Sequence, residues 1–191
     1  MKEKSSWMLI FLVALMLPCF GQGGNIPASG PDGKPGDKKS DEKKPDERKE
    51  EHAIRIDIPV VLEKADVVFN MDHLAFTGDM SIGMNYMRLL SNRFKEMNTP
   101  GHIIGVFHGD AAYLTLNDNA YNIYRKVSTG NPHKELIAEL LKLGVQIEEC
   151  AVSMKNHQWG NEDLLPGVKV NSGATGRLVQ LSQAGYVQIQ P

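Results

Sequence analysis

Residues 131–150 decide the fold class, and they read NPHKELIAELLKLGVQIEEC. Asn131 and Pro132 are typical of a helix start, because Asn caps the first turn and Pro is tolerated in it. The apolar residues that follow recur at helical spacing, and Gly144 is placed to end the helix. Residues 145–150 then favour a strand. A helix that leads through a glycine into a strand is the repeating step of an α/β domain.

The same alternation continues on both sides of this stretch. We expect strands at 65–69, 102–107, 168–170 and 186–189, and helices at 80–97, 119–126 and 172–184. Alternating strands and helices favour parallel pairing, because a parallel connection needs a crossover. The predicted fold is therefore a three-layer α/β/α sandwich with a mainly parallel, five-stranded sheet. Ligands in such folds bind beyond the carboxyl ends of the strands.

The first 21 residues are predicted to be a signal peptide. Lys2 and Lys4 precede an apolar run at 7–17, which is too short for the roughly 20 residues of a spanning helix. Small residues after the run favour cleavage behind Gly21, so we expect an exported protein, periplasmic or secreted, with no membrane attachment after cleavage. Two alternatives are a lipoprotein cleaved before Cys19 and an uncleaved anchor.

Residues 22–52 are rich in Gly, Pro, Lys, Asp and Glu. Such a composition cannot bury enough apolar surface to offset the entropy of ordering, so we predict a disordered, charged tether. The alternative is a contact with cell wall or anionic lipid, but positive and negative charges are nearly balanced there. The folded domain is expected at 53–191.

Composition and motifs exclude several classes of function. The chain has 21 Lys and Arg residues against 23 Asp and Glu, which gives a net charge of -2. The sequence therefore lacks the excess of positive charge that is typical of nucleic-acid-binding proteins. The glycine-rich phosphate cradles G-x-x-x-x-G-K-[ST] and G-x-G-x-x-G are absent, as are H-E-x-x-H and G-x-S-x-G. We therefore expect no bound cofactor.

Cys150 is the most informative residue. If Cys19 leaves with the signal peptide, Cys150 is the single cysteine of the mature chain. A single cysteine in an exported protein indicates a reactive thiol or an intermolecular bridge. A helix starting after Cys150 would stabilise a thiolate, whereas Glu148 and Glu149 would oppose it. On the residues alone, an inert buried cysteine is the open alternative.

Histidines are the other candidate site residues. His108 follows the strand predicted at 102–107, so we expect it at the same sheet edge as Cys150. His73 and His157 follow the first and third predicted strands, and two histidines with Cys150 could bind zinc or copper. Their separations show no ligand spacing pattern, so we expect no metal and ordinary loop hydrogen bonds.

Residues 144–154, GVQIEECAVSM, resemble a cysteine-containing segment of the DsrE/DsrF-like family. Residues 106–111 resemble its second strand and loop. The segments LLPGV at 164–168, SG at 172–173, LVQL at 178–181 and the stretch 185–191 resemble the ending of small, stand-alone members. This resemblance implies an α/β/α fold with a parallel sheet, assembly as trimers or hexamers, and sulfur held as a persulfide on the cysteine that Cys150 matches.

The resulting hypothesis is an exported DsrE-like sulfur carrier, or a sulfurtransferase-like protein, that uses Cys150. His108 and Lys155 are candidate electrostatic helpers. Its partners would be a sulfur donor or acceptor, either a protein or a small sulfur compound, and further copies of the chain. The hypothesis also predicts that Cys150 is at least partly exposed. The alternative is a non-catalytic module that binds a small ligand or a protein, with a buried structural cysteine. The relays of this family are cytoplasmic, which an export signal does not match.

Overall fold

The computed structural model describes residues 54–191. The predicted signal peptide at 1–21 and tether at 22–52 lie outside the described residues. Residues 54–66 form no helix or strand, and most of their apolar side chains are exposed. Thr99 and Arg93 donate to the carbonyl groups of Leu62 and Val60, at 3.0 and 3.4 Å. Regular structure thus begins at residue 67.

Five strands form one parallel sheet, as the sequence predicts. They are β1 (Val67–Met71), β4 (Ile103–Phe107), β5 (Gln146–Cys150), β6 (Lys169–Asn171) and β7 (Val187–Ile189). Their order across the sheet is β6-β5-β4-β1-β7, and each neighbouring pair is parallel. All residues of β1 and β4 are buried, which explains their nearly continuous apolar sequence. The carboxyl ends of all five strands therefore lie at one edge.

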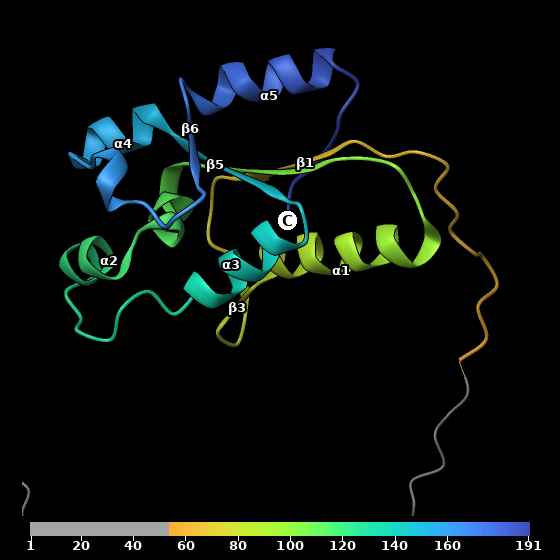
Figure 1. Ribbon diagram of the computed structural model, residues 1–191, viewed down its shortest axis with the longest axis horizontal. Helices are drawn as coiled ribbons and strands as arrows, with labels where there is room; N and C mark the ends of the chain where they lie inside the picture. Colours follow the sequence, from red (N-terminus) through yellow and green to blue (C-terminus); the bar gives the residue numbers. More distant parts are fainter. Residues whose placement is uncertain (1–53) are drawn as a thin grey trace, which may run out of the picture. The chain divides into compact units, whose positions relative to one another are not determined.

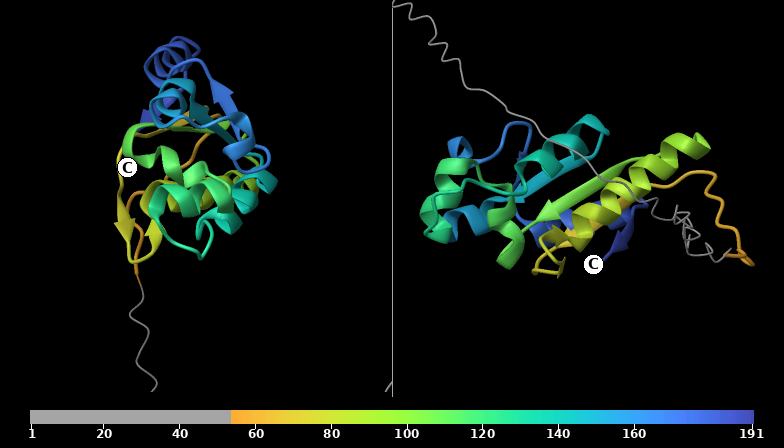
Figure 2. Two further views of the ribbon diagram at one scale, coloured as in Figure 1. Left: turned by 90° about the vertical axis from the view of Figure 1, so that its left-hand side faces the viewer. Right: turned by 90° about the horizontal axis from the view of Figure 1, so that it is seen from below.

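Helices cover both faces of the sheet (Figures 1 and 2). α1 (Ile82–Met97) and α3 (Lys134–Lys142) pack on one face, and α5 (Ala174–Gln183) packs on the other. Met84 and Met87 of α1 belong to the larger core and are fully buried, whereas Met97 at the end of the helix is exposed. The shorter elements are α2 (Asp118–Arg125), α4 (Ala151–His157) and the 3₁₀ turns η1 (Gly109–Thr115) and η2 (Asn161–Asp163). No helix within residues 54–191 is long and apolar enough to cross a membrane.

One local prediction differs from the structure, and one small element was not predicted. α3 begins at Lys134 with His133 as its N-cap, so Asn131 does not cap it directly. The buried Asn131 amide instead donates to the carbonyls of Leu114 and Leu116, at 2.9 and 2.6 Å. These carbonyl groups need a partner once they are buried. Asn131 Oδ1 meanwhile accepts a hydrogen bond from the His133 amide at 2.9 Å, so the side chain still bonds an amide just before the helix. The small hairpin β2 (Phe76–Thr77) and β3 (Met80–Ser81) was not predicted.

Candidate functional site

Cys150 lies at the carboxyl edge of the sheet. It is the last residue of β5 and the N-cap residue of α4. In the sheet register it pairs with Asn171 of β6, and its predecessor Glu149 pairs with Phe107 of β4. Its side chain is on the α5 side, in a cluster with Val106 and Ala174. The sequence therefore places this cysteine correctly, at the strand end where α/β folds bind ligands.

Backbone amides surround the thiol of Cys150. The amide of Ala174, the first residue of α5, donates to the sulfur at 3.3 Å. Burial raises the pKa of the thiol, but hydrogen bonds from the amides of Ser153, Ala174 and Val152 outweigh burial and lower it below the ordinary value. Amides at a helix start carry partial positive charge, so they favour the thiolate.

The prediction that Cys150 is partly exposed is wrong for the described chain, because the residue is 4% exposed. The first turn of α5 packs over the end of β5, and Ala174 closes the space above the sulfur. The same contact that covers the thiol also supplies one of its amide donors. The contact with α5 thus contributes both to the burial of the thiol and to the lowering of its pKa.

Glu149 does not oppose the thiolate as its position in the sequence suggests. Successive side chains of a strand point to opposite faces, so Glu149 lies on the other side of the sheet from Cys150. It is fully buried, and burial raises the pKa of its carboxyl group to about 9 despite hydrogen bonds with Thr115 and the Cys150 amide. The carboxyl group is therefore neutral near pH 7.

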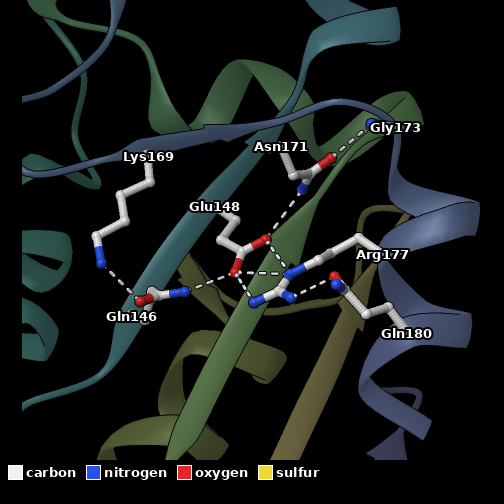
Figure 3. Close-up of polar contacts among 7 residues, drawn as sticks. All are labelled: Gln146, Glu148, Lys169, Asn171, Gly173, Arg177 and Gln180. Atoms are coloured by element: carbon white, nitrogen blue, oxygen red, sulfur yellow. Dashed lines mark hydrogen bonds and ion pairs between the residues drawn. The ribbon is translucent and has the colours of Figure 1, made fainter. Parts of the chain in front are cut away.

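Glu148 lies on the same face as Cys150 and is charged, but it is paired. Its carboxylate accepts hydrogen bonds from Arg177 Nε at 2.9 and 3.1 Å and from Arg177 Nη2 at 2.8 Å (Figure 3). Gln146 and Asn171 add two further donors, at 2.6 and 3.2 Å. Burial raises the pKa of Glu148, but these bonds and the charge of Arg177 lower it overall. We call Gln146, Glu148, Asn171 and Arg177 the Glu148 network.

His108 and Lys155 occupy different places. His108 follows β4 directly, so it lies at the neighbouring strand end, half-buried, and its Nε2 is 2.7 Å from Asn70 Oδ1. Burial lowers the pKa of His108, and the charge of Asp72 only partly offsets this. Lys155 is exposed in the last turn of α4. The structure thus brings His108, but not Lys155, to the strand end beside Cys150.

Some residues around the thiol were missed by sequence reasoning. Ser153 contributes its amide and accepts a hydrogen bond from the Gly109 amide at 3.1 Å. Ala174 and Arg177 come from α5, and no local motif links them to Cys150. The one available signal was Glu148, because a charged residue in a buried strand requires a partner.

No metal site appears in the part of the chain that the structure describes. Within residues 54–191, no three His, Cys, Asp or Glu side chains gather closely enough to hold a metal ion. His73 contacts Asp72, and His157 stacks on Trp159 with ring centroids 4.5 Å apart. A surface hollow of about 580 Å³ lies beside the Glu148 network, between β6 and α5, but Cys150 does not line it.

Comparison with known proteins identifies a family and a fold. The sequence profile of the DsrE/DsrF-like family matches residues 66–191. The structure of MTH1491 from Methanobacterium thermoautotrophicum, a protein of unknown function, is 21% identical with a TM-score of 0.52, and the match covers 66% of this chain and 99% of that one. The ychN protein of E. coli is 16% identical with a TM-score of 0.49, with the same coverage. No curated protein matches the chain significantly.

Proposed function

Because the chain belongs to the DsrE/DsrF-like family, we propose that Cys150 carries sulfane sulfur as a persulfide. Membership supports a role of the sulfur-relay type. The observation that carries the assignment to this residue is its position at two helix starts: Cys150 is the N-cap residue of α4, and the first amide of α5, that of Ala174, donates to the sulfur at 3.3 Å. These amides lower the pKa of the thiol. A thiolate is the nucleophile that sulfur transfer requires.

The proposed reaction proceeds in two displacements. The Cys150 thiolate attacks the outer sulfur of a donor persulfide, R–S–SH. The donor S–S bond breaks, R–S⁻ leaves, and Cys150 becomes Cys–S–SH. An acceptor thiolate then attacks the outer sulfur, and Cys150 leaves again as a thiolate. No net oxidant or reductant is needed, and a low thiol pKa assists the second step because a weaker base is a better leaving group.

Burial of Cys150 favours a small donor or acceptor. The residue is only 4% exposed, and a bulky thiol cannot approach the sulfur while α5 holds its place. We therefore propose an inorganic polysulfide or a small persulfide as the donor. A protein donor would need the turn at 171–174 to open.

The two predicted helpers would act differently. The lowered pKa of His108 leaves its ring neutral near pH 7, so it would act by hydrogen bonding at the strand end and not by charge. Lys155 is an exposed basic side chain on α4, where it would attract an anionic polysulfide. Attraction of this kind weakens with ionic strength.

Sulfur uptake tests the proposal directly. We expect the full chain carrying Cys19→Ser to gain the mass of one sulfur atom after exposure to inorganic polysulfide, measured by intact mass spectrometry. A reductant should remove that sulfur. The same chain with Cys150→Ser added is the control and should gain nothing. A folded protein that takes up no sulfur at Cys150 would contradict the carrier role.

Burial of Cys150 also supports a second candidate function, a non-catalytic binding module in which the cysteine is structural. In that case the thiol should react with a small alkylating agent only after unfolding, and Cys150→Ser should lower stability by about 1–3 kcal/mol, since a buried hydroxyl replaces a thiol in an apolar cluster. Alkylation of the folded chain distinguishes the two functions.

Export and assembly are further parts of the proposal, and each needs its own measurement. We propose that the protein is exported, periplasmic or secreted, and that the mature chain begins at Gln22. N-terminal sequencing of the native protein checks this, and a start at a lipid-modified Cys19 would replace it with a membrane-anchored form. We also propose a homo-oligomer, trimer or hexamer, which light scattering of the purified protein measures.

A further inference from the structure

We propose that Arg177 and Glu148 are positioning residues for the Cys150 thiol. Their ion pair holds the turn at 171–174, and this turn aims the Ala174 amide at the sulfur. The inference deepens the proposed function and rests on it for its biological meaning, but the geometry can be tested through the thiol alone.

The first step is the anchoring of α5 to β5. Arg177 is the fourth residue of α5, at the end of its first turn, and Glu148 is two residues before Cys150 on the same face of β5. The side chain of Glu148 is 4% exposed and that of Arg177 is 24% exposed. Three hydrogen bonds join the two side chains, so two nitrogens of the Arg177 guanidinium contact both oxygens of the Glu148 carboxylate. The pair therefore fixes both the distance and the rotation of α5 relative to the strand.

The second step is the turn that leads into α5. Glu148 Oε2 accepts a hydrogen bond from Asn171 Nδ2 at 3.2 Å, and Asn171 Oδ1 accepts one from the Gly173 amide at 3.0 Å (Figure 3). Gly173 is the N-cap residue of α5, and its carbonyl accepts the first helical bond from the Arg177 amide. One carboxylate is thus connected to both ends of the first turn of α5.

The third step is the effect on the thiol. The next amide after Gly173 is that of Ala174, which donates to Cys150 Sγ. Without Arg177, the turn would lose one of its two attachments to Glu148, and Glu148 would become an unpaired negative charge on the face of Cys150. Both changes disfavour a thiolate, the first by weakening an amide donor and the second by charge repulsion.

Other charged groups near this edge do not substitute for Arg177. Glu149 lies on the opposite face and is neutral, and Lys169 of β6 donates to Gln146 at 2.7 Å. The remaining titratable groups around Cys150 are His108, Asp110, Tyr113, Lys155 and His157 on the neighbouring elements, and Tyr186, which packs against the same cluster as Cys150. The ring of His108 is bound to Asn70, Tyr113 lies in the core on the opposite face, and Asp110, Lys155 and His157 are exposed.

Titration of the thiol tests this inference. In the full chain with Cys19→Ser, Arg177→Gln should raise the pKa of Cys150 by about one unit, which means about tenfold less thiolate at a fixed pH below the pKa. The thiolate is followed by its ultraviolet absorbance and by the pH profile of iodoacetamide alkylation. Arg177→Lys keeps the positive charge but loses the planar guanidinium that bonds Glu148 through two nitrogens. The pKa of Cys150 in this variant should therefore lie between those of the wild type and Arg177→Gln. Arg88→Gln is the matched control, because Arg88 is 29% exposed but lies on α1, on the opposite face of the sheet, and it should leave the profile unchanged.

A folded Arg177→Gln chain with the wild-type pH profile would overturn the inference. If Arg177→Gln fails to fold, the double variant Glu148→Met, Arg177→Met replaces the test, because apolar replacement of a whole buried pair is often neutral for stability. That variant should fold and still show a raised thiol pKa, and a wild-type pKa in it would equally overturn the inference. Sulfur uptake by the parent chain is measured separately, so a parent that takes up no sulfur rejects the proposed function without affecting this result.

Discussion

Replacement of Glu149 by glutamine is expected to stabilise the folded protein at neutral pH. Glu149 is fully buried on the α1 and α3 side of the sheet, and burial raises the pKa of its carboxyl group to about 9. Thr115 Oγ1 lies 2.8 Å from one oxygen, and the Cys150 amide donates to the other at 3.1 Å. A glutamine side chain keeps an acceptor for the amide and offers its NH₂ group to Thr115, so the variant retains both contacts.

The sign of the effect follows from proton binding. Below the ordinary pKa of 4.5, Glu149 is protonated in both the folded and the unfolded chain. Between that value and about 9, the unfolded chain loses the proton and the folded chain keeps it. The stability supplied by the raised pKa is therefore fully present below 4.5 and is lost as the pH rises towards 9. The loss is about 1.4 kcal/mol per pH unit, or about 2–3 kcal/mol between pH 5 and pH 7.

Urea unfolding of the wild type and of Glu149→Gln across this pH range measures the difference. The two free energies of unfolding should be similar near pH 4 and diverge by about 3 kcal/mol by pH 7, with glutamine the more stable. Glu135→Gln is the control, because Glu135 is exposed on α3 and should leave the pH dependence as in the wild type. Parallel curves for the wild type and Glu149→Gln would mean that the buried carboxyl group titrates normally.

Much of the fold follows from local sequence patterns. The apolar runs at 102–107 and 145–150 predicted two strands that the structure confirms within a residue or two as β4 and β5. The order of strands across the sheet is set by crossovers and by long-range packing. No local pattern specifies that β1 lies between β4 and β7.

The candidate site was predictable in its position but not in its surroundings. The end of a strand and a single cysteine pointed to Cys150, and the strand period already placed Glu148 and Cys150 on one face. The burial of Cys150 depends on α5, whose Ala174 is 24 residues further along the chain. The partner of Glu148 is likewise distant, since Arg177 is 29 residues away. Contacts at such separations follow from the assembled layers and not from any motif.

Replacement of Gly109 by alanine is expected to destabilise the protein and to disturb the thiol site together. Gly109 follows His108 at the end of β4 and has a φ of +55°, which an L-residue adopts at a cost of roughly 1–2 kcal/mol. A Cβ at this position would also lie 2.7 Å from the backbone oxygen of Asp72. That oxygen already accepts a hydrogen bond from the Asp110 amide at 2.9 Å, so it cannot move away from the new Cβ without breaking this bond.

The turn at Gly109 reaches the thiol through Ser153. The Gly109 amide donates to Ser153 Oγ at 3.1 Å, and the amide and side chain of Ser153 both lower the pKa of Cys150. We expect Gly109→Ala to lower the free energy of unfolding by about 2–4 kcal/mol and to raise the pKa of Cys150.

Gly144→Ala is the matched control, because Gly144 has a φ of +90° with no atom within 4 Å of its Cβ position. Gly144→Ala should lower the free energy of unfolding by only about 1–2 kcal/mol and leave the pKa of Cys150 unchanged. Equal losses in the two variants, measured by urea unfolding, would show that backbone conformation alone sets the cost and that the contact with Asp72 carries none of it.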